Sequence, residues 1–334
     1  MKNALFIGGT GTISAAISRS IAASDEWTLY LINRGNRPEA VPDVVHVITA
    51  DINDEAEVAR LTDGMHFDCV ADFIAFVPEH VERDWRLFRG RTRQYIFISS
   101  ASAYQKPPQS PFIDEDTPLD NPYWEYSRNK IFCEEALMRH YHDDGFPVTI
   151  VRPSHTYDER RIPLGVHGAN GSWQIARRML DGKPVIIHGD GTSLWTMTFN
   201  TDFAQGFIGL MAHPNAIGEA FQIMSDEVLT WNQIYQSVAD ALGVELHAVH
   251  ITSQALAATG RYDYTGSLLG DKANSVIFNT AKLRSLVPSF KPCVPFRDGI
   301  RRTVNNVLAH PELQVLDPDF DHFCDTVIAM SCGK

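Results

Sequence analysis

The sequence contains few cysteines and no long hydrophobic run. Its 5 cysteines, in a chain of 334 residues, are widely spaced and form no C-x-x-C pair, unlike a disulfide framework or a zinc site. No stretch reaches the roughly 18 apolar residues that a membrane-spanning helix needs. Met1, Lys2 and Asn3 lead directly into Ala4–Ile7, an apolar run too short for a secretion signal. We therefore expect a cytoplasmic protein with free thiols and no membrane association.

Positive charge is also scarce. The chain has 29 Lys and Arg residues against 41 Asp and Glu, which gives a formal net charge of −12 at pH 7. Binding to the phosphate backbone of a nucleic acid needs clustered positive charge, and here the basic residues are scattered. The sequence thus disfavours a nucleic acid as partner. A hydrophobic content of 44% is enough for a large core and excludes wholesale disorder.

The first half of the chain alternates short apolar runs with helical patterns, which indicates βαβ units and a parallel sheet. Ile13, Ile17 and Ile21 recur every four residues and predict a helix between the first two strands. Most of the predicted strands are continuous apolar runs, as expected for a sheet with helices on both faces. These strands are Ala4–Ile7, Thr28–Ile32, Val44–Thr49, Cys69–Phe73, Tyr95–Ser99 and Val148–Val151. The predicted fold class is therefore α/β, with a doubly wound parallel sheet.

After Pro153 the elements become shorter and are separated by turn-forming stretches, which indicates a smaller C-terminal α/β lobe. Its predicted helices are Trp173–Leu180, Trp231–Leu242 and Phe296–Leu308. We assign residues 1–155, with later returns near 192–215 and 276–290, to the first domain. Residues 156–191 and 216–330 form the second lobe, and we expect the two to share one cleft.

A glycine-rich turn joins the first predicted strand to the first helix. In the segment from Gly8 to Ser14, glycine permits a tight bend and the close approach of a pyrophosphate to the main chain. The helix N-terminus then offers free N–H groups to the phosphates. Ser14 is a small residue where a third glycine usually allows helix and strand to pack closely. The turn predicts a dinucleotide site that includes Gly8, Gly11, Thr12 and Ile13.

The second predicted strand ends at Asn33 and Arg34. An NAD enzyme usually presents an acidic side chain here to the ribose 2′-hydroxyl, whereas a nearby arginine accommodates a 2′-phosphate. Asn33 is not acidic and Arg34, with Arg37 behind it, is cationic, so the sequence favours NADP over NAD. Alternatively, Arg34 is an ordinary loop residue. Asp51, which follows the third strand, is placed to meet the adenine or simply caps the strand.

Tyr126 and Lys130 are four residues apart, so on a helix both side chains share one face. A free tyrosine has a pKa near about 10, and an ammonium one turn away favours its ionised form. A serine from the cluster that follows the fifth strand can hold the substrate oxygen across the cleft. Tyr126 could then exchange a proton with a substrate hydroxyl while a nicotinamide exchanges a hydride with the same carbon. The alternative is that Tyr126 and Lys130 are four residues apart by accident and have no catalytic role.

These motifs together resemble those of the extended short-chain dehydrogenases/reductases of the NAD-dependent epimerase/dehydratase family. The match covers nearly the whole chain, and the matching segments are Gly8–Gly11, Asp51, Ser99–Ser100 with Tyr104, Glu115–Pro118, Tyr126 with Lys130, Arg152–Pro153, Gly189–Thr192 and residues 279–300. The resemblance implies a Rossmann-type nucleotide-binding domain, a substrate lobe, a bound NAD(P) and commonly a homodimer. The apolar helices around Trp85–Phe88 and Ile131–Met138 could supply a dimer interface.

The resemblance also implies roles for individual residues. Tyr126 is the catalytic acid/base, Lys130 binds the cofactor ribose and tunes Tyr126, and the catalytic hydroxyl falls on Ser100, with Ser99 and Ser102 as less favoured positions. We assign Phe73, Ser99, Pro153 and His155, which lie at or after strand ends, to the cofactor site together with Tyr126 and Lys130. For His155 a purely structural role is the alternative. The substrate residues are Ser100, Ser102 and Trp195. The spacing of the histidine pairs suits no metal site, so we assign no metal ligand.

The sequence departs from the family pattern at two places. Family dehydratases carry an Asp-Glu pair after the catalytic hydroxyl, where this chain has Ala101 and Ser102, which disfavours 4,6-dehydration. Sugar-nucleotide enzymes usually carry an arginine for the diphosphate where this chain has Trp195, which cannot neutralise a diphosphate. Trp195 could instead stack on a ring or pack within the lobe. The arginines that could compensate are Arg160, Arg161, Arg177 and Arg178.

We therefore predict an NAD(P)-dependent epimerase or oxidoreductase that acts on a hydroxyl of a sugar or sugar nucleotide. The glycine turn, Asn33-Arg34-Gly35 and the missing arginine are also reminiscent of an atypical branch that includes chloroplast stem-loop-binding proteins, which bind RNA. The alternative is thus a non-catalytic NADP-binding regulatory or RNA-binding protein on the same fold.

Overall fold

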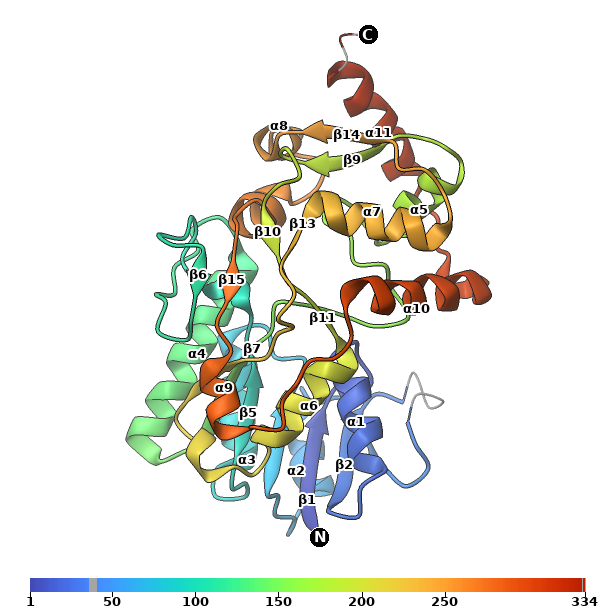
Figure 1. Ribbon diagram of the computed structural model, residues 1–334. Helices are drawn as coiled ribbons and strands as arrows, with labels where there is room; N and C mark the ends of the chain where they lie inside the picture. The colour runs from blue at the N-terminus through green and yellow to red at the C-terminus, as the bar shows by residue number, and fades with distance from the viewer. Residues whose placement is uncertain (36–40, 332, 334) are drawn as a thin grey trace.

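A computed structural model describes residues 1–35, 41–331 and 333 (Figure 1). In this part of the chain, seven parallel strands form a central sheet in the order β12-β7-β5-β4-β1-β2-β3. These strands are β1 (Lys2–Ile7), β2 (Trp27–Asn33), β3 (His46–Thr49), β4 (Cys69–Asp72), β5 (Tyr95–Ile98), β7 (Val148–Arg152) and β12 (Ala220–Gln222). From β1 the chain adds β2 and β3 on one side and then β4, β5, β7 and β12 on the other. This reversal of direction confirms the predicted doubly wound α/β fold.

Helices cover both faces of the sheet. One face carries α1 (Ser14–Ala22), α6 (Asn200–Leu210) and α9 (Ala281–Leu286), and the other carries α2 (Glu55–Leu61), α3 (Pro78–Phe88) and α4 (Glu125–Asp144). Ile17 and Ile21 of α1 pack with Phe207 of α6 on the first face, as the spacing of the isoleucines predicts. On the second face Phe88 and Leu137 belong to one cluster. Because both faces are covered, the central strands are buried on both sides.

The edge strand β12 lies within residues 216–330, which the sequence assigned to the second lobe. It nevertheless pairs with β7 through Phe221 and Val151, so the chain returns to the central sheet at this point. The strand has three residues and ends in Gln222, so it shows neither an apolar run nor an alternating pattern. At the opposite edge, β3 starts at His46 rather than Val44, whose side chain is 67% exposed.

The second lobe lies beyond the carboxyl ends of the central strands, at the top of Figure 1. Its helices α5 (Trp173–Leu180) and α7 (Trp231–Leu242) have the predicted bounds, and α10 (Phe296–Ala309) extends one residue further. Further elements outside the central sheet and the helices that cover it are β6 (Phe112–Ile113), β8 (His155–Tyr157), β9 (Val185–His188), β10 (Leu194–Trp195), β11 (Met197–Phe199), β13 (Leu229–Thr230), β14 (Ala248–Ile251), α8 (Ser253–Ala258), a π-helix (Thr265–Lys272), β15 (Ile277–Phe278) and α11 (Pro318–Ser331). Of these, β6, β10, β11 and β15 lie in residues that the sequence assigned to the first domain.

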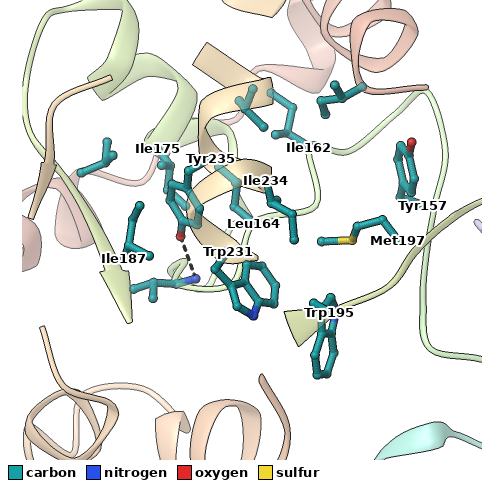
Figure 2. Close-up of a cluster of buried hydrophobic side chains, with 14 of the residues drawn as sticks. Tyr157, Ile162, Leu164, Ile175, Ile187, Trp195, Met197, Trp231, Ile234 and Tyr235 are labelled. Carbon is teal, nitrogen blue, oxygen red and sulfur yellow. Dashed lines mark hydrogen bonds between the residues drawn. The ribbon is translucent and has the colours of Figure 1, made fainter. Parts of the chain in front are cut away.

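The core of this lobe gathers around one face of α7 (Figure 2). Trp231, Ile234 and Tyr235 are fully buried and pack with Ile175 of α5. The Tyr235 hydroxyl accepts a hydrogen bond from the main-chain N–H of Val166 at 3.2 Å, so its buried polar atom is satisfied. These contacts join α5 to α7 in the core of the lobe.

A buried ion network lies under the carboxyl end of β4. The Arg83 guanidinium contacts Asp72 Oδ2 at 3.0 Å and Asp84 Oδ1 at 2.9 Å. The Tyr95 hydroxyl donates to Asp84 Oδ2 at 2.6 Å. Burial, together with the charge of Asp84, raises the pKa of Asp72, and Arg83 opposes this shift. One cation thus compensates two carboxyl groups that are removed from water.

The cysteines Cys69, Cys133, Cys293 and Cys324 are free thiols, and Cys332 lies outside the described residues. Among the helices described, none combines the length and apolar character that would carry it across a membrane.

Candidate active site

The glycine turn between β1 and α1 is held by side chains as well as by backbone. Gly8 has a φ of +82°, and a Cβ there would lie 2.5 Å from Cγ2 of Ile74. A Cβ on Gly9 would lie 2.5 Å from Cδ2 of Leu31, so Gly9 is where the turn meets the sheet most closely. Ser14 is more than a small residue, because its Oγ donates to the Gly8 carbonyl at 2.8 Å and accepts from the Gly11 N–H at 2.9 Å. The serine therefore fixes the shape of the turn.

The turn borders a cavity of about 550 Å³. It is lined by Gly8, Thr10, Gly11, Ile32, Asn33, Arg34, Ala50, Asp51, Ile52, Asn53 and Ile74. The structure thus brings together five residues that the sequence assigned to the cofactor, whereas Arg37 lies outside the described residues. Asn33 Oδ1 accepts from the Gly35 N–H at 2.8 Å and Asp51 Oδ1 from the Asn53 N–H at 3.0 Å, so both also stabilise turns. A cradle in which a Cβ at Gly8 would clash fits a dinucleotide.

Thr12 and Ile13 line a neighbouring cavity of about 280 Å³, together with His155 and Arg161. His155 also lines a further cavity, which contains Ser100 and Tyr126. Burial, and to a smaller extent the charges of Lys272 and His167, lowers the pKa of His155 to about 3, so the imidazole is neutral at physiological pH. His155 therefore stands between the glycine turn and the predicted catalytic residues.

Ser100 and Tyr126 meet in a cavity of about 300 Å³, which Ser102, Pro153 and His155 also line. Burial raises the pKa of Tyr126 to about 12, and a hydrogen bond with the Ser100 side chain opposes this shift. Ser100 Oγ lies 2.9 Å from Ser102 Oγ, to which Ser127 donates at 2.7 Å. Three serine hydroxyls thus form a chain that ends at Tyr126.

Lys130 lies one helical turn after Tyr126 on α4, as predicted, and is 2% exposed. Its Nζ donates to the carbonyls of Ala75 and Ile98, each at 2.6 Å, and lies 5.7 Å from the centroid of the Tyr126 ring. Burial lowers the pKa of Lys130 to about 8. Burial dominates the pKa of Tyr126 in this structure, and the Lys130 ammonium is engaged by the two carbonyls instead.

Three residues that the sequence assigned to the cofactor do not line these cavities: Lys130, whose contacts are given above, Phe73 and Ser99. The Phe73 ring packs in the core against Phe6 and Phe207, with centroid distances of 5.3 and 5.5 Å. The Ser99 hydroxyl donates to Glu134. Ser99 and Ser100 are neighbours at the end of a strand, where successive side chains point to opposite sides, so only one of them can face the cavity.

The cavity has a second wall that sequence reasoning missed except for Trp195. This wall consists of Trp124, Trp195, Asp271 and Lys272. Lys272 Nζ lies 5.7 Å from the centroid of Trp124, 5.9 Å from that of Trp195 and 3.3 Å from Asp271 Oδ2. Trp195 is 3% exposed and also packs on Trp231 at 5.6 Å, so it is both a lining residue and part of the lobe (Figure 2).

The main chain at Lys272 is fixed by three donors. Its carbonyl accepts hydrogen bonds from His188 Nε2 at 3.2 Å, Ser193 Oγ at 3.0 Å and Trp231 Nε1 at 3.2 Å. Lys272 also ends the π-helix, a conformation that is often found at functional sites. More than 140 residues separate Asp271 and Lys272 from Tyr126, and no spacing in the sequence connects them.

Three of the four arginines that could replace the missing diphosphate ligand have other partners. Arg160 pairs with Asp158 at 2.8 Å and contacts the Thr10 carbonyl at 3.3 Å. Arg177 pairs with Asp181, and Arg178 with Asp321 and Asp325. Arg161, which is exposed, lines the cavity beside Thr12.

In the described part of the chain, no group of three or more His, Cys, Asp or Glu side chains could hold a metal ion.

Comparison with known proteins agrees with this geometry. Residues 4–223 match the NAD dependent epimerase/dehydratase family. The 2'-dehydrokanamycin reductase of Streptomyces kanamyceticus is 23% identical over 86% of this chain and 79% of its own length. The chloroplast stem-loop binding protein of 41 kDa b of Arabidopsis thaliana is 26% identical over 72% of this chain and 64% of its own length.

Solved structures share the fold. An epimerase from Methanothermobacter thermautotrophicus has a TM-score of 0.75 at 17% identity and covers 94% of both chains. The UDP-glucuronic acid 4-epimerase of Bacillus cereus in complex with NAD has a TM-score of 0.73 at 17% identity, over 91% of this chain and 96% of that one. Because the family match spans more than half of the chain and agrees with the resemblance predicted from its motifs, the protein belongs to the NAD-dependent epimerase/dehydratase family.

Proposed function

We propose that the protein is an NAD(P)-dependent epimerase or oxidoreductase that acts on a hydroxyl of a sugar or sugar nucleotide. The observation that carries the proposal is the meeting of Ser100 and Tyr126 in one cavity, with Lys130 one helical turn behind Tyr126. Two relatives point in the same direction. One is named a reductase and the other, from Methanocaldococcus jannaschii, a putative UDP-glucose 4-epimerase.

Each residue has a distinct role in the proposed reaction. The nicotinamide cofactor, held by Gly8, Gly11, Asn33, Arg34 and Asp51, would supply or accept the hydride when bound. Ser100 donates a hydrogen bond to the reacting substrate oxygen, and Tyr126 exchanges a proton with it.

The pKa of Tyr126, raised to about 12, makes the free phenol a poor base at neutral pH. An ammonium at Lys130 that turns from its carbonyl partners toward the phenol would favour the phenolate. Ala101 and Ser102, which follow Ser100, offer no carboxylate for the elimination of water, so 4,6-dehydration is disfavoured.

A direct test is mass spectrometry of the small molecules released when the purified protein is denatured. We expect a nicotinamide dinucleotide, because the lining of the first cavity fits one. A cofactor that stays bound through purification favours an epimerase, which returns the hydride to its substrate, whereas one that exchanges freely favours a dehydrogenase or reductase. Failure to bind either NAD or NADP in a subsequent titration would contradict the proposal.

We also propose that NADP is preferred over NAD, because Arg34 is exposed at the edge of the first cavity beside a non-acidic Asn33. The Arg34→Ala variant should lower the ratio of NADP to NAD affinity on the order of tenfold, since a charge-assisted hydrogen bond to the 2′-phosphate is lost. Calorimetric titration of both cofactors measures the ratio. Arg19→Ala, on the exposed face of α1, is the matched control and should leave it unchanged. A wild-type preference for NAD would refute this assignment.

The family resemblance further supports a homodimer in the cytoplasm. The exposed ring of Phe132 on α4, 50% accessible, lies on one of the two helices suggested for the interface.

A further inference from the structure

The wall formed by Trp124, Trp195, Asp271 and Lys272 restricts which substrates the cavity can take. The cavity has a volume of about 300 Å³. This is the lower limit of ordinary ligand sites, which span roughly 300–1,000 Å³. Such a space suits one sugar ring with small substituents better than a ring that carries a nucleoside diphosphate.

The wall carries one positive and one negative side chain, Lys272 and Asp271, whose charges cancel. Lys272 is the one cationic side chain among the described residues that line the cavity, because His155 is neutral. Asp271 lies 3.3 Å from the Lys272 ammonium, and both residues are more than nine-tenths buried. A diphosphate would need uncompensated cations in this position, and the Asp271 carboxylate would repel it.

The remaining groups of the wall suit a neutral ring with several hydroxyls. The Nε1 atom of Trp195 is buried and has no hydrogen-bond partner among the described residues. Leaving such a donor unpaired is costly, and a hydroxyl or ring oxygen could satisfy it. The Trp124 and Trp195 rings offer apolar surface to the C–H face of a sugar. Asp271 can accept hydrogen bonds from hydroxyls, and Lys272 can donate to them.

From this we infer that the substrate is a sugar or glycoside without a phosphate group, rather than a sugar nucleotide. The inference rests on the proposed function, which it narrows to one substrate class. The ring stacks on the two tryptophans, and its hydroxyls bind between Asp271 and Lys272. The carbon to be oxidised, or reduced in the reverse direction, then lies beside Ser100 and Tyr126.

The test is a calorimetric titration of the cofactor-loaded protein with UDP, so that UDP cannot occupy the nucleotide site. We expect no measurable binding of UDP to the wild type. The Trp195→Arg variant should gain UDP affinity on the order of tenfold or more, because it adds a second cation to a wall that has one carboxylate. The matched control, Leu308→Arg, adds an arginine at an exposed position of α10 outside the cavity and should change nothing. UDP binding to the wild type would overturn the inference.

A second arm compares turnover of matched substrates, with oxidoreduction followed by absorbance at the nicotinamide band and epimerisation by NMR of the sugar. The panel contains methyl glycosides of common hexoses and aminohexoses, together with UDP-glucose and UDP-N-acetylglucosamine. Turnover of any methyl glycoside supports the inference, and turnover confined to the UDP sugars refutes it while the proposed function stands. If no compound in the panel is turned over, the UDP titration alone decides the inference. Binding of a glycoside with neither a redox change nor epimerisation of the sugar would refute the proposed function and leave the substrate class intact.

Discussion

The Tyr126→Phe variant should lose activity by about 10²- to 10⁴-fold, the range expected when a general acid/base is removed. The substitution deletes only the hydroxyl, and the ring still contacts Phe76 and Trp124, at 6.4 and 5.0 Å between centroids. Cofactor affinity should therefore remain within about twofold, since the first cavity is untouched. Steady-state turnover and cofactor titration measure the two effects separately.

The matched control for this variant is Tyr123→Phe. Tyr123 precedes the same helix, is 40% exposed and does not line the catalytic cavity, so its variant should keep wild-type turnover. If Tyr126→Phe retained the function of the protein, the residue would not be the acid/base. The alternative of a non-catalytic NADP-binding or RNA-binding protein would then be favoured.

The second large effect is expected for stability. Arg83→Met should lower the free energy of unfolding by about 3–5 kcal/mol, because it leaves buried carboxyl groups without their cation. Asp72 and Asp84 are both 0% exposed, and Arg83 contacts each of them. Denaturation with urea followed by circular dichroism measures the loss.

The pH dependence identifies the cause of this loss. Without Arg83, the pKa of Asp72, already raised by burial, should rise further in the folded state. A carboxyl group whose pKa is higher in the folded than in the unfolded state stabilises the fold at low pH, and this contribution is lost as the pH rises. The deficit should thus be larger at high pH and shrink as the pH falls and the carboxyl groups become protonated.

The matched control for Arg83→Met is Arg86→Met. Arg86 lies on the same helix, is 48% exposed and pairs with Glu55 on the surface. Its replacement should cost less than about 1 kcal/mol. A deficit for Arg83→Met that does not depend on pH would indicate a loss of packing instead.

The sequence predicts most of the fold because the central strands are buried on both faces. A strand that is buried on both faces is apolar throughout, so a continuous apolar run such as Tyr95–Ile98 is easily recognised as a strand. The apolar patterns of α5 and α7 are equally clear and predict the bounds of these helices. The strand β12 is different, since its three residues become a strand only by pairing with β7. Tertiary context decides such elements, and no local pattern reveals them.

The residues of the candidate site also divide into those that a local pattern predicts and those that only the folded chain brings together. The Tyr126–Lys130 spacing and the glycine turn are local features, so sequence alone predicts where they lie. The sequence does not show which serine of the cluster faces the cavity, because this depends on how β5 ends. Ser99 does not face it, since its hydroxyl donates to Glu134. Asp271 and Lys272 reach the cavity through hydrogen bonds made by distant elements. Their contribution arises only in the folded chain.

Helix α4 contributes to both sides of the cavity. Ser127 is fully buried and donates to Ser102, and between Ser102 Oγ and Ser100 Oγ either hydroxyl can be the donor. The Ser102 N–H is also directed at Ser100 Oγ, at 3.2 Å. When Ser102 donates its proton to Ser100, the Ser100 proton is directed to Tyr126 or to an oxygen in the cavity. Helix α4 supplies both the phenol and, through Ser127, the first donor of the serine chain, so one element of secondary structure influences the hydrogen bonds on both sides of the reacting atom.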